Sequence, residues 1–166
     1  MDIAICLDRM ETSLKVRTAL DFAYRAKKEN HKIIFLTLLE PNCHPRNVNI
    51  LYTGGGKIID FPIFHLSEFY DREAIFIALD VKSNEFTQKL PRRLWNAFYC
   101  WDLEWLNQKD FYYSEIYEKY GMANNLWCRS PDHKAVLENT CGAKVKKVIS
   151  NFQYDLVMGE IEHATL

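Results

Sequence analysis

Short apolar runs alternate with amphipathic stretches along the chain. Runs rich in isoleucine, leucine and aromatic side chains predict buried strands, and polar and apolar residues at helical spacing between them predict helices. The strands are expected at 2–7, 32–39, 74–79, 125–129 and 145–149, in a tryptophan-rich run from Leu94, and in shorter β-like runs at 48–52 and 58–64. The helices are expected at 12–28, 67–73, 82–89 and 109–120, and after Ser130 and Pro131, which are typical first residues of a helix.

This alternation predicts an α/β fold with a mostly parallel sheet flanked by helices. A length of 166 residues is most simply one domain, so we expect a single Rossmann-like domain over 1–166 and no second domain. Residues 153–166 are interpreted as a short tail.

The stretch from Leu94 to Leu106 holds three of the chain's four tryptophans and is interpreted as the central core strand. It places Asp102 and Glu104 just beyond its apolar part. If the strand continued, both carboxylates would share one face and one pKa would rise, which suits general acid or base work. If a loop follows instead, they are solvated charges that need not meet.

The net charge and the cysteine content limit which partners and which compartment we expect for this chain. The net charge is −1, so no global field attracts nucleic acid or an anionic membrane, although a local basic patch is still compatible with it. The five cysteines form no C-x-x-C pair, which indicates buried free thiols in a reducing compartment such as the cytoplasm. No secretory signal opens the chain, and no apolar run is long enough to span a membrane.

Two loops are candidates for ligand contact. Gly54, Gly55 and Gly56 either form a hairpin or loop turn or let the backbone approach a phosphate or sugar. Asp8 follows the first strand, where α/β proteins usually bind ligands, and either binds a sugar hydroxyl or is a solvated loop carboxylate. The loop after Asp8 lacks the glycines of a dinucleotide site.

His133 lies in the first turn of the helix that Ser130 opens. A neutral imidazole there contacts a ligand at the carboxyl edge of the sheet, or is simply a surface histidine. The other histidines show no metal-ligand spacing, so neither a metal nor a cofactor is expected.

From Asn125 onward the sequence resembles the end of the N-terminal domain in GT-B glycosyltransferases. The resemblance is carried by Leu126 to His133, by Glu138-Asn139 and by Val145 to Phe152. In that family a strand leads to a residue like Ser130, a helix follows, and a phrase like Val148 to Phe152 leads into a second Rossmann-like domain.

The resemblance implies an acceptor-binding half that moves sugar from a nucleotide-sugar to a hydroxyl acceptor only with a partner domain, or within a homo-oligomer. It makes Asp8, Asp102, Glu104 and His133 the acceptor-side candidates, one of which takes the hydroxyl proton, and it makes Gly54–Gly56 and Ser130 the candidates for binding. The first-strand loop departs from the family pattern. The chain also ends soon after Phe152, so the donor-binding domain is missing from it.

Two other classes of function stay open. One is a non-enzymatic module that binds a nucleotide or another protein, and the other is a structural or interaction protein that retains the fold. The transferase interpretation predicts that Asp8, Gly54–Gly56, Asp102 and His133 line one cleft at the carboxyl ends of the strands.

Overall fold

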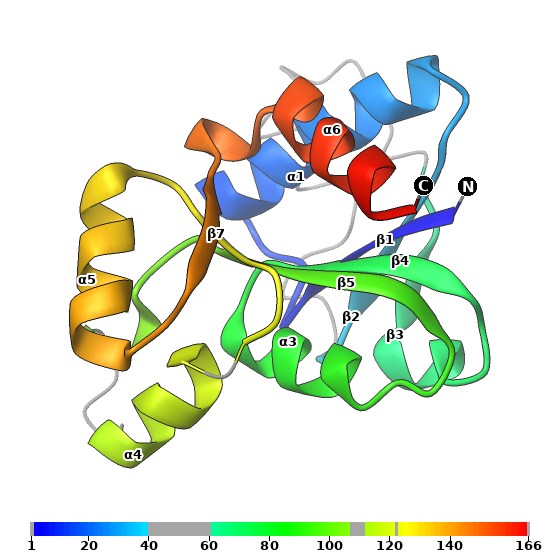
Figure 1. Ribbon diagram of the computed structural model, residues 1–166. Coiled ribbons are helices and arrows are strands. Elements are labelled where there is room, and N and C mark those ends of the chain that lie inside the picture. The colour runs from blue at the N-terminus through cyan, green and yellow to red at the C-terminus, as the bar shows by residue number, and fades with distance from the viewer. Residues whose placement is uncertain (1, 40–60, 107–111, 122, 166) are drawn as a thin grey trace.

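The computed structural model describes residues 2–39, 61–106, 112–121 and 123–165 (Figure 1). Seven strands in these residues form one sheet in the order β3-β2-β1-β4-β5-β6-β7, and every neighbouring pair is parallel. The strands are β1 (Asp2–Leu7), β2 (Lys32–Thr37), β3 (Ile63–His65), β4 (Ala74–Ala78), β5 (Arg93–Cys100), β6 (Leu126–Cys128) and β7 (Val145–Val148). The expected Rossmann-like α/β fold is confirmed.

Helices cover both faces of the sheet. The main helices are α1 (Leu14–Lys28), α3 (Val81–Gln88), α4 (Tyr113–Ile116), α5 (Pro131–Cys141) and α6 (Tyr154–Thr165). Shorter turns are the 3-10 helices η1 (Leu66–Phe69), η2 (Glu104–Leu106) and η4 (Ser150–Phe152), and the π-helical η3 (Tyr117–Gly121).

Alternation along each strand divides the core into two layers. In β1, Ile3 and Ile5 lie in the layer that includes residues of α1 and α6, and Ala4 and Cys6 lie in the layer that includes residues of α5 and η3. Both faces of the strands are therefore buried, which explains why they read as continuous apolar runs.

Several helix boundaries follow directly from local sequence. Ser13 caps α1, and its Oγ accepts a hydrogen bond from the Val16 amide. Ser130 caps α5, which ends at Gly142 with a φ of 61°. Because a left-handed residue at a helix end is normally glycine, both ends of α5 were predictable.

The interpretation of 153–166 as a tail is wrong, because most of this segment is the helix α6. Its buried residues Tyr154, Val157, Met158 and Ile161 recur at helical spacing and pack in the same core layer as residues of α1.

The tryptophan-rich stretch is a strand only as far as Cys100, and β4 rather than β5 is the middle strand of the seven. Two helices also differ. The helix expected at 67–73 is the shorter η1 (Leu66–Phe69), which His65 caps. The described part of 109–120 is one α-helical turn followed by η3.

Of the remaining expectations, those about four cysteines fall on described residues, and several others do not. Cys6, Cys100, Cys128 and Cys141 are buried and free, as predicted. The β-like run at 48–52, the triplet Gly54–Gly56 and Cys43 lie outside the described residues. In the part of the chain that is described, no helix has the length and apolar character needed to cross a membrane.

Candidate functional site

The candidate site lies at the carboxyl edge of the sheet, where the direction of strand order reverses. The chain passes from β1 to β2 on one side, whereas β4 continues to β5 on the other. The two crossovers leave in opposite directions, and this is where open parallel sheets bind ligands. Asp8 and Asp80 stand just beyond the ends of these neighbouring strands.

Asp80 is fully engaged by its surroundings. Its side chain is 3% exposed. Oδ1 accepts a hydrogen bond from the Ser83 amide at 2.9 Å, and Oδ2 accepts one from the Asp8 amide at 2.5 Å. Lys15 Nζ lies 3.6 Å from Oδ2. Asp80 therefore caps α3 and ties the end of β1 to it, which is a structural role.

Glu104 reaches the same place from η2. Its Oε1 accepts a hydrogen bond from the Val81 amide at 3.0 Å, at the start of α3. Burial, and after it the charge of Asp80, raise the pKa of this carboxyl from 4.5 to about 7 against the opposing effects of the Val81 amide and Lys15. A carboxyl group with this pKa gains and loses a proton near neutral pH.

Asp8 is the least engaged carboxylate of this group. Its side chain is 30% exposed, and Oδ2 lies 3.9 Å from Lys82 Nζ. Oδ1 is buried and has no hydrogen-bond partner among the described residues. A buried carboxylate oxygen normally has a partner, so this oxygen is an exception. The accessible part of the carboxylate is the rest of the side chain, on the side of Lys82.

Asp102 and Glu104 do not form a pair, because the chain leaves the strand before reaching them. Asp102 is 56% exposed, and its Oδ1 lies 3.8 Å from Arg129 Nη1. The Arg129 guanidinium in turn stands 5.1 Å from the centroid of the Trp101 ring. The neighbours that raise the pKa of Glu104 by their charge are Asp80, which was not among the sequence candidates, and, more weakly, Asp8.

His133 lies beyond β6 on the same edge. Its amide donates to Ser130 Oγ at 3.2 Å, so Ser130 acts as a helix cap. Burial lowers the pKa of the imidazole, and the charge of Arg129 lowers it further. Its Nδ1 is buried without a partner in the described part of the chain.

The predicted residues thus share one edge but separate into two groups. Asp8 and Glu104 stand with Asp80, whereas Asp102 and His133 stand with Arg129. Asp80 comes just after β4, as Asp8 comes just after the neighbouring strand β1. This shared position at the end of a strand is the sequence feature that indicates Asp80 as a site residue. Gly54–Gly56 lie outside the described residues, so the expectation of one cleft with them stays a prediction.

No family model, curated protein or solved structure matches this chain.

The helix N-termini at this edge are occupied by the protein itself. Ser13 caps α1 and Ser130 caps α5, while Asp80 and Glu104 together accept from the first amides of α3. Free amides at a helix N-terminus attract phosphate, but carboxylates at that position repel it. The edge therefore suits a neutral donor of hydrogen bonds. Among the described residues, no cluster of three or more His, Cys, Asp or Glu side chains has the geometry of a metal site.

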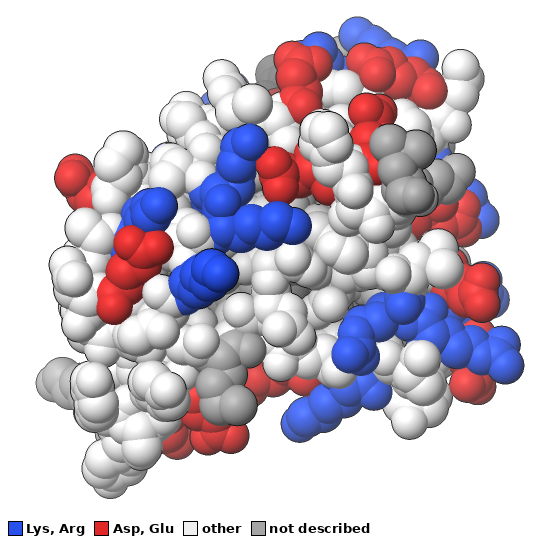
Figure 2. All heavy atoms as spheres, viewed as in Figure 1, with Lys and Arg blue, Asp and Glu red and all other residues white. Residues whose placement is uncertain are grey.

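On the face shown in Figure 2, basic side chains gather in two places, one over β7 and one at the lower right, and acidic side chains lie beside each. Two of the basic side chains on β7 have partners. Lys147 Nζ lies 3.1 Å from a carboxylate oxygen of Glu160, and Lys146 Nζ donates to Asn125 Oδ1 at 3.3 Å.

Proposed function

We propose that this chain is the acceptor-binding half of a GT-B-like glycosyltransferase, which acts on a hydroxyl acceptor together with a partner domain that holds the nucleotide-sugar. The observation that carries the proposal is Glu104, a largely buried carboxyl group with a pKa of about 7 beside the point where strand order reverses. A general base works best when its pKa lies near the working pH.

In the proposed step, the acceptor O–H bond breaks and its proton moves to the Glu104 carboxylate. The acceptor oxygen forms a bond to the anomeric carbon of the donor sugar. The bond from that carbon to the phosphate oxygen breaks, and the nucleoside diphosphate leaves. The part-exposed carboxylate of Asp8 accepts a hydrogen bond from a second hydroxyl of the acceptor.

A nucleotide-binding module is the main competing function. Its phosphates would need free amides or unpaired cations at the reversal point. The capped N-termini of α1, α3 and α5 and the carboxylates of Asp8, Asp80 and Glu104 argue for a hydroxyl ligand instead.

Backbone amide NMR of the uniformly ¹⁵N-labelled chain tests the proposal. The ligands are glucose, galactose, N-acetylglucosamine and p-nitrophenyl β-glucoside on one side, and UDP and GDP on the other. We expect at least one hydroxyl compound to shift the amides of Asp8, Val81 and Glu104, while UDP and GDP leave them unchanged.

Glu104→Gln keeps the oxygen that accepts from Val81 but removes the group that accepts a proton. Its matched control is Glu85→Gln, because Glu85 is 41% exposed on α3 and lies 3.7 Å from Lys119. The proposal is overturned if UDP or GDP shifts these amides, if no compound shifts them, or if both substitutions change the response equally.

A further inference from the structure

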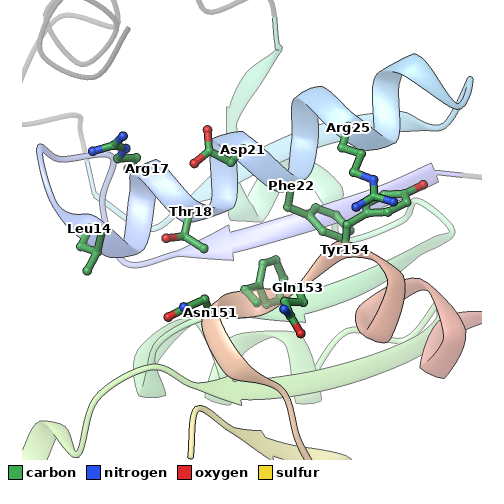
Figure 3. A pocket seen from close by; sticks show the side chains of 10 residues that line it. Leu14, Arg17, Thr18, Asp21, Phe22, Arg25, Asn151, Gln153 and Tyr154 are labelled. Atoms are coloured by element: carbon green, nitrogen blue, oxygen red, sulfur yellow. The ribbon is translucent and has the colours of Figure 1, made fainter.

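A groove of about 500 Å³ lies between α1 and the segment that follows β7. Figure 3 shows Thr18 and Phe22 turned from α1 toward the segment that carries Asn151, Gln153 and Tyr154. The volume falls within the range of small-molecule sites. The groove begins at the carboxyl edge, because α1 starts there and η4 follows the end of β7, but its lining residues are not those of the proposed acceptor site.

One wall of the groove is held in an unusual backbone conformation. Asn151 and Phe152 are consecutive residues with φ values of 49° and 52°. Asparagine tolerates this region, but phenylalanine rarely adopts it, and such residues concentrate at functional sites.

Tyr99 maintains this conformation from inside the core. Its hydroxyl donates to the Ile149 carbonyl at 2.7 Å and accepts from the Phe152 amide at 3.2 Å. Tyr99 is thus a positioning residue for the wall of the groove and does not line it.

Three uncharged side chains at the rim of the groove can hydrogen-bond a ligand. No hydrogen bond within the described residues engages the side chains of Thr18, Asn151 or Gln153. Arg25 is already paired, with its guanidinium nitrogens 2.5 Å from Asp155 and 3.8 Å from Glu29. The remaining charges that line the groove, on Arg17 and Asp21, have opposite sign. Side-chain amides and hydroxyls both donate and accept hydrogen bonds. They therefore suit a ligand that carries several hydroxyl groups, which also donate and accept.

The apolar part of the groove is a recessed aromatic floor. The rings of Phe22 and Phe152 are 4.9 Å apart, and Phe152 is only 2% exposed. A docking helix would need accessible apolar anchors to bury, and this floor provides few.

We infer that this groove is a saccharide-binding site, which takes a neutral oligosaccharide through hydrogen bonds to Thr18, Asn151 and Gln153. The inference goes beyond the proposed function and does not depend on it, because the groove shares no residue with the group around Glu104.

The test is amide NMR titration of the full chain with maltose, cellobiose, lactose and N,N′-diacetylchitobiose. We expect at least one disaccharide to shift the amides of Thr18, Phe22, Asn151 and Gln153 in a saturable way. Thr18→Val and Gln153→Ala each remove a side chain that can hydrogen-bond the ligand, so each should raise the Kd about three- to tenfold.

Two matched controls separate this site from the rest of the molecule. Glu162→Ala removes an exposed polar side chain of α6 outside the groove, and Glu104→Gln alters only the proposed acceptor site. Both should leave the Kd unchanged. The inference is overturned if no disaccharide shifts the groove amides, or if Thr18→Val and Gln153→Ala leave the Kd unchanged. Shifts confined to Asp8, Val81 and Glu104 would also overturn it, yet would support the proposed function.

Discussion

Asp8 and Asp80 occupy equivalent positions after neighbouring strands, but their surroundings give them different roles. Asp80 is almost fully buried and accepts from two amides, whereas Asp8 keeps one oxygen without a partner in the described residues. Residue type and position alone therefore do not separate a structural carboxylate from a candidate ligand-binding one. The separation comes from which amides each side chain meets.

Asp80→Ala should lower the free energy of unfolding by about 2–4 kcal/mol, because it removes a helix cap and leaves the Asp8 and Ser83 amides without acceptors. Urea unfolding followed by tryptophan fluorescence measures the loss. Asp132→Ala is the control, since Asp132 is an exposed carboxylate in the first turn of α5 and does not cap it. It should cost less than about 1 kcal/mol. Equal losses for both variants would refute the structural role of Asp80.

At the scale of single elements, the two helices α5 and α6 each have a glycine, one just after the helix and one inside it, and the two glycines differ in backbone conformation and in the space around them. Gly142 ends α5 with a φ of 61°, and a Cβ there would lie 3.1 Å from an atom of the Tyr117 ring. Gly159 lies inside α6, and a Cβ there would meet no atom within 4 Å.

The same substitution should therefore have opposite effects at these two glycines. Gly142→Ala should destabilise the protein by about 1 kcal/mol or more, because alanine resists the left-handed conformation. Gly159→Ala should stabilise it by about 0.5–1 kcal/mol, because alanine favours the helix and restricts the unfolded chain. Thermal and urea unfolding of both variants provide the comparison. Destabilisation by Gly159→Ala would contradict the expectation for α6.

The strands were predictable because both faces of the sheet are buried, so each strand leaves an apolar run in the sequence. The predicted run 2–7 coincides with β1. The helix α6 was not predicted, because it follows directly on the turn at Asn151 and Phe152. This turn was interpreted as the end of the folded elements, although the apolar residues after it recur at helical spacing.

The candidate site was less predictable than the fold. Asp8, Glu104 and His133 lie at the carboxyl edge of the sheet, as their positions after predicted strands indicated, because parallel strands all end at that edge. The partners of Glu104 were not predictable, because the 3-10 turn at 104–106 directs its side chain toward α3, which is distant in sequence. Tyr99 and the groove beside α1 also depend on contacts between distant segments, and no local pattern indicates them.

At the scale of the whole molecule, two groups on the same edge make stability depend on pH in opposite directions. The pKa of Glu104 is raised from 4.5 to about 7, so between these values the folded chain binds more protons than the unfolded chain, and stability falls as pH rises. The pKa of His133 is lowered from 6.5, so below that value its contribution makes stability rise with pH.

Comparing wild type with Glu104→Gln isolates the first contribution, because His133 is common to both. The stability of Glu104→Gln relative to wild type should rise by up to about 3 kcal/mol as pH increases from 4.5 to about 7, and stay level above that. Lys15, Asp80 and Asp8 face Glu104 and are unchanged in the variant. Urea unfolding at intervals across this range measures the difference, with Glu85→Gln, at an exposed carboxyl of α3, as the matched substitution. A pH-independent difference for Glu104→Gln would mean that this carboxyl titrates normally, which would remove the physical basis for Glu104 as the proton acceptor.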